Sequence, residues 1–331
     1  MSGRIYPMVR FILLGILVGA PLATQGQPQK AQRIGWLLAV PSTSVPTIEA
    51  VAEFRQKLSR LGRVEGSNLQ VDYRYANGGP QELPALAAEL VALKVDVIVT
   101  DGSPSTRAAQ QATTTIPIVM AVSAAPVEQG FVKSLGRPGG NITGLSMVLP
   151  ELAMKRLELI KELSPKAKRV AVLGRGQVSG SDLQWQSTEA AANTLSLELI
   201  RLQLDFGTPD YERLLDTARR EKADALILLA DSLFARDRAQ IIALANKQRL
   251  PTLYFERLFV EAGGLMSYGP SIGEMFRQAA VYVDKILDGA KPAELPVEQP
   301  TKFELFLNVE AASALGITFQ PSLRSRADVL Q

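Results

Sequence analysis

From residue 33 to residue 255, short apolar segments rich in β-branched residues alternate with segments of helical periodicity. The segments VDVIVT (95–100) and IPIVMAV (116–122) are typical strands, and residues 47–61 have their apolar side chains on one helical face. Since parallel strands need a crossover connection, usually a helix, this alternation predicts βαβ units around a parallel sheet. The expected fold class is therefore α/β.

The alternation occurs twice. The segment VDVIVTDGSPS (95–105) matches ADALILLADSL (223–233), and each match is followed by a strand that contains proline, IPIVM at 116 and LPTLY at 250. This similarity predicts two doubly wound parallel-sheet lobes. We expect the first lobe to comprise residues 32–144 plus about 270–290, and the second lobe residues 145–265 plus about 291–331.

Two glycine-rich segments lie where the pattern changes lobe. In FVKSLGRPGGNITG (131–144) we expect a helix to end over 131–135, because glycine and proline follow it, and a short strand to begin near 141. The segment is either the approach to an inter-lobe crossing or an ordinary surface turn. A second crossing is expected at GGLMSYGP (263–270), before a helix over 272–287. The expected hinge residues are Gly144, Gly264 and Ser267.

Ligands of doubly wound sheets bind at the carboxyl ends of the strands, so the loops there predict a cleft between the lobes. In the loops of the first lobe, Ser103, Ser105 and Thr106 follow a strand and begin a helix. They could bind a ligand carboxylate or cap that helix, and the two roles are compatible. The remaining candidates in this lobe are Ser42, Ser44, Asp101 and Ser123; the first two could equally form a polar surface turn.

Asp231 ends the matched strand of the second lobe, as Asp101 does in the first. It could hold a ligand ammonium group; the alternative is that it caps the next helix or pairs with a nearby Arg. Tyr254 and Tyr268 are candidates for the aromatic wall of a flat ligand.

The composition excludes several classes of function. The chain has no histidine and no cysteine, so triads with His or Cys and the usual zinc sites are excluded. The formal charge is only +3, and no basic stripe interleaved with aromatic residues indicates nucleic acid. Gly174, Gly176 and Gly180 do not have the spacing of a dinucleotide-binding fingerprint. We therefore expect no cofactor and no metal.

Residues 1–26 have the pattern of a secretory signal peptide. Arg4 and Arg10 precede an apolar run of ten residues (11–20), which is too short to span a bilayer, and small residues follow. Because no cysteine follows the run, the mature protein is expected to be periplasmic and not a lipoprotein.

Several segments also carry a family resemblance. APVEQGFVKSLGRPGGNITG, EAGGLMSYGP and DKILDGAKPAELPVEQP resemble the ABC transporter substrate-binding proteins of the TrpX-like group, and the resemblance extends from about residue 32 to the C-terminus. It implies a type I periplasmic-binding-protein fold with a small-molecule ligand in the cleft. Aromatic amino acids or related carboxylates are the associated ligands. The family commonly has Asp-Pro where this chain has Ala125-Pro126, so its specificity could differ.

The resemblance and the residues together predict an exported solute-binding protein, not an enzyme. We expect a monomer that closes on its ligand and delivers it to an ABC transporter permease in the membrane. An extracytoplasmic ligand-sensing domain that feeds a receptor could have this same sequence, and a secreted enzyme on the same fold is the remaining alternative. No helix-turn-helix precedes the first lobe, which disfavours direct gene regulation.

Overall fold

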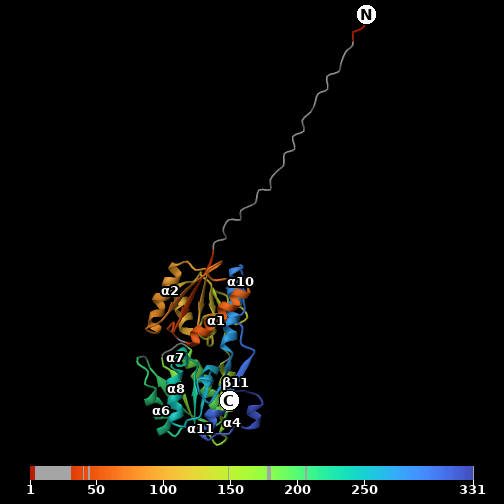
Figure 1. The fold of residues 1–331 in the computed structure, drawn as a ribbon. Coiled ribbons are helices and arrows are strands. Elements are labelled where there is room, and N and C mark those ends of the chain that lie inside the picture. The colour runs from red at the N-terminus through yellow and green to blue at the C-terminus, as the bar shows by residue number, and fades with distance from the viewer. Residues whose placement is uncertain are drawn as a thin grey trace. The chain divides into compact units, whose positions relative to one another are not determined.

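The computed structural model describes residues 1–3, 31–39, 41–43, 45–147, 149–176, 180–205 and 207–330. All but the first three residues of the expected signal peptide, and also Ser44, lie outside these ranges. Residues 31–331 form one compact unit. Within it the strands form two sheets, of five and seven strands, in which parallel pairing predominates. The α/β fold with two doubly wound sheets is therefore confirmed (Figure 1).

The first sheet has the strand order β2-β1-β3-β4-β5, and all of its pairs are parallel. Its strands are β1 (Gln32–Leu38), β2 (Leu69–Tyr75), β3 (Val97–Thr100), β4 (Ile118–Met120) and β5 (Ile142–Gly144). The helices among these strands are α1 (Val45–Arg60), α2 (Leu83–Ala92) and α3 (Ser103–Ala112), with a 3-10 turn at Pro80–Glu82. β3 and β4 are buried along their whole length, as strands covered on both faces must be.

The second sheet repeats this order as β7-β6-β8-β9-β10 and extends it with β11 and β12. Its strands are β6 (Arg169–Arg175), β7 (Glu198–Leu204), β8 (Ala225–Leu228), β9 (Thr252–Tyr254), β10 (Met266–Pro270), β11 (Phe303–Asn308) and β12 (Asp328–Leu330). The helices of this part are α4 (Leu149–Leu163), α5 (Ser181–Thr194), α6 (Tyr211–Arg220), α7 (Ser232–Arg236), α8 (Arg238–Lys247), α9 (Arg257–Glu261), α11 (Val309–Leu315) and α12 (Pro321–Arg324). Only the β10–β11 pair is antiparallel among the pairs of described strands.

One helix, α10 (Ile272–Leu287), follows the second sheet in sequence but packs on the first. It contacts α1, β3 and β4, and Figure 1 shows it alongside α1. Its Phe276 ring joins the buried aromatic cluster of the first lobe, stacked 5.9 Å from the ring of Trp36. The chain therefore passes between the sheets after β5, after β10 and again before β11.

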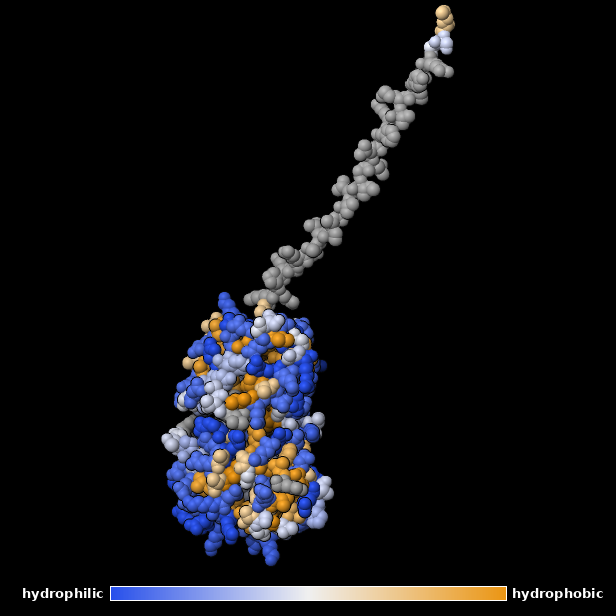
Figure 2. Space-filling model, viewed as in Figure 1, coloured by the Kyte–Doolittle hydropathy of each residue, from blue (hydrophilic) through white to orange (hydrophobic). Residues whose placement is uncertain are grey.

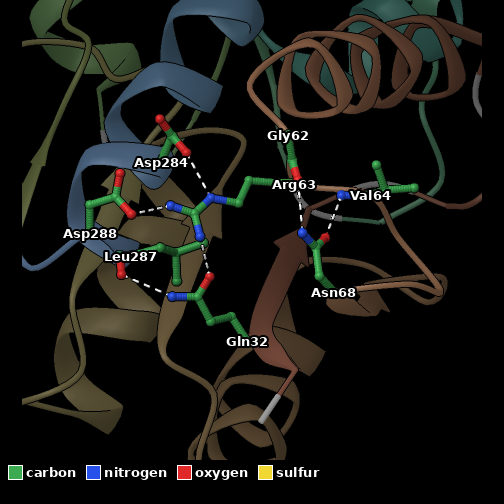
Figure 3. Close-up of polar contacts among 8 residues, drawn as sticks. All are labelled: Gln32, Gly62, Arg63, Val64, Asn68, Asp284, Leu287 and Asp288. Carbon is green, nitrogen blue, oxygen red and sulfur yellow. Dashed lines mark hydrogen bonds and ion pairs between the residues drawn. The ribbon is translucent and has the colours of Figure 1, made fainter. Parts of the chain in front are cut away.

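Arg63 fixes the far end of α10 to the first sheet. Its Nε donates to Asp284 Oδ1 at 2.7 Å, and its other nitrogens donate to Asp288 and to the Gln32 side chain (Figure 3). The Asn68 amide closes the turn that carries Arg63, accepting from Val64 N at 2.7 Å. The end of α1, the start of β1 and the end of α10 are thus joined at one point.

The segment 131–135 is not a helix, contrary to expectation. Phe131 N and Val132 N both donate to the carbonyl oxygen of Pro126, which closes a turn over 126–132. The two apolar side chains are adjacent in sequence and both are buried, whereas a helix would place them about 100° apart. The sequence predicts the end of a helix here, but the side chains of Phe131 and Val132 enter the core from a turn.

Candidate ligand-binding cleft

The loops at the carboxyl ends of both sheets enclose a cavity of about 160 Å³. From the first lobe come the residues after β3 and β4 and the first turn of α10. From the second come the residues before α5, after β8 and after β9, together with Arg156 of α4. Apolar side chains form much of the wall, among them Leu38, Phe255, Ile272 and Phe276. A cavity lined mostly by apolar groups with a few convergent polar ones is typical of a small-molecule site.

Two long helices begin at this cavity, one from each lobe. At α3 the residue before the helix is Gly102, and at α5 it is Gly180; neither helix receives a side-chain cap. Gly180 has φ +93°, and a Cβ there would lie 3.2 Å from the Ala124 Cβ and 3.3 Å from Ser103 Oγ. At this point the absence of a side chain on Gly180 allows its backbone to approach Ala124 and Ser103 of the first lobe.

Arg156 places a buried positive charge in the wall. The residue is only 6% exposed, and its Nε donates to the carbonyl oxygen of Tyr268 at 3.0 Å. No carboxylate of the described residues lies within ion-pair distance of its guanidinium, and burial lowers the pKa of Arg156 to about 10. Because a buried charge without a counter-ion is costly, this guanidinium is suited to receive an anionic group.

Asp101 and Asp231 lie at matched places in the two lobes. Asp101 accepts from Ala39 N at 3.0 Å and from Ser105 Oγ at 2.8 Å, and burial raises its pKa to about 6. Asp231 caps α7 through Leu233 N at 2.8 Å, and its Oδ1 lies 3.5 Å from an Arg175 guanidinium nitrogen. Burial raises the pKa of Asp231 as well, and its negative charge contributes to the raised pKa of Asp101. The two carboxyls thus interact across the cavity.

Two further polar groups of the wall have no hydrogen-bond partner within the described part of the chain. One is Ser123 Oγ in the first lobe, and the other is Glu256 Oε1 in the second. Burial raises the pKa of Glu256 to about 7, because the charged form has lost its water.

Four of the predicted site residues line the cavity: Asp101, Ser103, Ser123 and Asp231. Ser103 Oγ accepts from the Gln129 amide at 2.9 Å. Ser105 and Thr106 lie one layer behind, where Ser105 orients Asp101 and the Thr106 hydroxyl donates to Gly102 O at 2.8 Å.

Four other predictions concern residues away from the cavity wall or outside the described ranges. Ser42 is exposed and does not line the cavity, and Ser44 is not described. Tyr254 is fully buried in the second lobe, stacked 4.7 Å from Phe259, so it forms core and not a ligand wall. Tyr268 stacks on Phe303 and meets the site only through the carbonyl that Arg156 binds.

Of the expected hinge residues, only Gly144 lies at a crossing, as the last residue of β5. Its φ is +130°, and a Cβ there would come within 2.2 Å of Met120 O. Gly264 and Ser267 belong to the second lobe: Gly264 precedes β10 and packs against the Tyr254 ring, and Ser267 lies in β10, paired with β9 and β11. The second crossing falls after them, at Ser271, because β10 continues to Pro270.

Arg156 and Gln184 were not predicted from the sequence, and Glu256 was predicted only as part of the cleft-wall loop 254–256, without a role of its own. Arg156 had a usable signal, since it stands among the apolar residues of one face of α4. A charged residue on an apolar face is unusual unless a partner or ligand compensates it. Gln184 is in the first turn of α5 and binds the backbone of Ala230 in both directions. Glu256 had no signal beyond its place after a strand.

The fold and the cleft define a two-lobed solute-binding protein. Residues 44–330 match the model of the ABC transporter substrate binding protein family, and the chain belongs to that family. Among the described residues, no helix combines the length and apolar character needed to cross a membrane.

Three similar proteins illustrate the relationship. A tyrosine-binding protein of Clostridioides difficile is 28% identical over 292 residues, which cover 88% of this chain and 82% of that protein. A conserved domain protein of Vibrio cholerae superposes with a TM-score of 0.85 at 28% identity, over 91% of this chain and all of that one. An ABC domain from Streptococcus pneumoniae, solved in complex with L-Trp, has a TM-score of 0.83 at 24% identity, with coverage of 91% and 100%.

Proposed function

We propose that this protein captures an amino acid with an aromatic side chain and delivers it to the permease of an ABC importer. The observation that carries the proposal is one cavity that contains both kinds of charge: the unpaired Arg156 guanidinium and the Asp101 and Asp231 carboxyls. A zwitterion offers a counter-charge to each.

Arg156 is the proposed partner of the ligand carboxylate. Its guanidinium is buried, and its Nε is held by Tyr268 O, so the remaining nitrogens keep a fixed orientation. Charge-assisted hydrogen bonds of arginine with a carboxylate are short and strong. The uncapped starts of α3 and α5 add a favourable field for the same anion.

The ligand ammonium is proposed to lie between Asp231 and Asp101. Burial raises the pKa of both carboxyls, and the charge of Asp231 raises that of Asp101 further, so a positive charge placed between them stabilises their ionised forms. Each comes from a different lobe, so a ligand that contacts both favours the closed arrangement. Gly144 and the segment around Ser271 are the proposed hinges.

The side chain of the ligand is proposed to be aromatic. Phe255 and Phe276 both line the cavity, and they come from opposite lobes. The relative from Clostridioides difficile, 28% identical, is a tyrosine-binding protein. We further propose that residues 1–26 are removed on export, that the mature protein is a periplasmic monomer, and that it does no chemistry on the ligand.

Calorimetry with three related compounds tests this function. Residues 27–331 would be titrated at pH 7.5 with tyrosine, with tyramine, which lacks the carboxylate, and with 3-(4-hydroxyphenyl)propionate, which lacks the ammonium group. Tyrosine is expected to bind at least about 100-fold more tightly than either analogue, since each analogue leaves a buried charge unpaired. A thermal shift supports the result: a ligand at 100 times its Kd adds about 2.7 kcal/mol of stability.

Equal binding of the three compounds would contradict a zwitterion site. Recovery of chemically altered ligand would contradict a pure binding function. If no proteinogenic amino acid shifts the unfolding temperature, the proposal is wrong.

A further inference from the structure

The proposed binding of a zwitterion leaves one buried carboxyl oxygen of Glu256 without a hydrogen-bond partner among the described residues. The residue is 8% exposed and lines the cavity, and its Oε1 has no hydrogen-bond partner within the described ranges. It precedes α9 as Asp231 precedes α7, but Asp231 caps its helix and Glu256 does not. The Glu256 side chain is therefore free for another partner.

The charges around Glu256 come from three helices. Arg238 of α8 favours its ionised form, whereas Glu49 of α1 and Glu261 of α9 disfavour it. Arg238 is the only cation of the three. Its guanidinium donates to Ala235 O at 3.0 Å and is not within ion-pair distance of the Glu256 carboxyl. Leaving a buried carboxyl oxygen unsatisfied is costly, so a hydrogen-bond donor brought by the ligand would be favoured here.

The position of Glu256 relates it to the ligand side chain. Its neighbour Phe255 contributes to the aromatic wall, and Ser123 Oγ, the other unsatisfied group, faces the same cavity from the first lobe. The ligand ammonium already has Asp101 and Asp231, and a third carboxylate on one ammonium would leave negative charge in excess. The ligand group nearest to Glu256 is thus expected to be a neutral donor.

We propose that Glu256 accepts a hydrogen bond from an O–H or N–H group on the ligand side chain, so that the site selects donor-bearing aromatic amino acids over purely apolar ones. This inference rests on the proposed function of the same cavity. Ser123 serves as a second partner that can donate to or accept from the same group.

This role makes binding depend on pH in a defined direction. Glu256 has a pKa of about 7 without ligand, and the hydrogen bond favours its ionised form. The affinity for a donor-bearing ligand should therefore rise by up to about tenfold from pH 6 to pH 8. Asp101 and Asp231 also titrate at raised pKa, so the contribution of Glu256 is the difference between the wild type and Glu256→Gln.

Calorimetry with tyrosine and phenylalanine tests the inference, because these ligands differ by one hydroxyl. For the wild type at pH 8 we expect tyrosine to bind roughly 10- to 100-fold more tightly. In Glu256→Leu the preference should fall to within a few-fold while phenylalanine still binds. In Glu256→Gln the tyrosine affinity should lose the part of its pH dependence assigned to Glu256.

The control variant is Glu261→Gln. Glu261 belongs to the helix that follows Glu256 and lies in its field, but it pairs with Arg257 and does not line the cavity. It should retain the tyrosine preference. Thermal unfolding of each variant establishes that it is folded before affinities are compared.

The possible outcomes separate this inference from the proposed function. If tyrosine binds but its preference over phenylalanine is absent in the wild type or persists in Glu256→Leu, the inference is overturned and the amino-acid site remains. The inference would also be overturned if the affinity falls from pH 6 to pH 8 in the wild type but not in Glu256→Gln. The ligand would then prefer protonated Glu256, which donates a hydrogen bond and does not accept one. If neither amino acid binds, both proposals fail.

Discussion

The two lobes share one strand order but differ in the chemistry that they bring to the cleft. The order β2-β1-β3-β4-β5 in the first lobe corresponds to β7-β6-β8-β9-β10 in the second. The loop that follows β4 in the first lobe places the neutral Ser123 at the cavity, whereas the loop that follows β9 in the second lobe places Glu256 there. Arg156 and Asp231 also line the cavity from the second lobe, whereas Asp101 is the one charged residue of the first lobe among the described residues that line it.

The two lobes therefore share the positions of their loops but not the side chains on them. The repeated order brings the loops of both sheets to one cavity, because strand ends of parallel sheets collect at one edge. The side chains on those loops are independent of it. Both oxygens of Asp101 accept hydrogen bonds from the first lobe, whereas the contacts of Asp231 with described residues are to its Oδ1, and Glu256 Oε1 has no hydrogen-bond partner among them. The second lobe is therefore expected to provide most of the ligand's polar recognition.

Removal of the Arg156 charge should have the largest effect on binding. Arg156→Met keeps an unbranched side chain but replaces the guanidinium with an apolar end, which leaves the ligand carboxylate without its cation. Affinity for tyrosine should therefore fall at least about 100-fold by calorimetry. Arg169→Met is the matched control, since Arg169 lies in the same lobe but forms an exposed pair with Glu198. A similar loss in both variants, or no loss in Arg156→Met, would place the carboxylate elsewhere.

The matched aspartates should differ when each is changed to asparagine. We expect Asp231→Asn to weaken tyrosine binding by roughly 10- to 100-fold, and Asp101→Asn by less, because both oxygens of Asp101 already accept within its own lobe, whereas the contacts of Asp231 with described residues are to Oδ1. Parallel titrations of the two variants give the comparison. A greater loss in Asp101→Asn would show that the first lobe holds the ammonium group.

Glu256 should make the unliganded protein less stable as pH rises. A buried acid whose pKa is about 7 in the folded state, above its ordinary value, opposes folding where it is ionised. Stability should therefore decrease between about pH 4.5 and pH 7 and level off above, with the raised pKa values of Asp101 and Asp231 acting in the same direction. Glu256→Gln should unfold a few degrees higher than the wild type at pH 8, on the order of 2 kcal/mol, and at nearly the same temperature at about pH 4. Equal unfolding temperatures at pH 8 would indicate a solvated carboxyl.

The smallest effect is expected for Tyr254→Phe. The ring of Tyr254 stacks on Phe259 inside the second lobe, and its hydroxyl has no partner in the described part of the chain. Removing that hydroxyl should leave the ligand affinity within about twofold and the stability equal or slightly higher. A tenfold weaker affinity would restore Tyr254 as part of the ligand wall.

Much of the fold followed from the sequence because strand and helix periods alternate over most of the chain. The matched segments at 95–105 and 223–233 contain Asp101, Ser103 and Asp231, which line the cavity; their binding roles stay predictions. Tyr254 could not be placed in this way. The strand β9 is buried on both faces, so no alternation of apolar and polar residues tells which side chains point to the core.

Arg156 was missed, and Glu256 was given no role of its own, for a related reason. The candidate residues were polar residues in the loops after strands, but Arg156 reaches the cavity from the second turn of helix α4. Glu256 is in such a loop, yet its importance depends on burial and on the lack of a partner. Both are properties of the packed structure and not of sequence spacing.

The return of α10 to the first lobe has a consequence for how this protein matures. The first lobe is completed by residues 272–287, which are synthesised only after nearly the whole second lobe. Until then, the faces of α1 and the first sheet that α10 covers, with Trp36 and Phe54 among them, lack their partner. A nascent chain thus carries an incomplete apolar surface for most of its synthesis, and such surfaces are what chaperones recognise. The second lobe, continuous from α4 to β10, can assemble most of its sheet before the first lobe is finished.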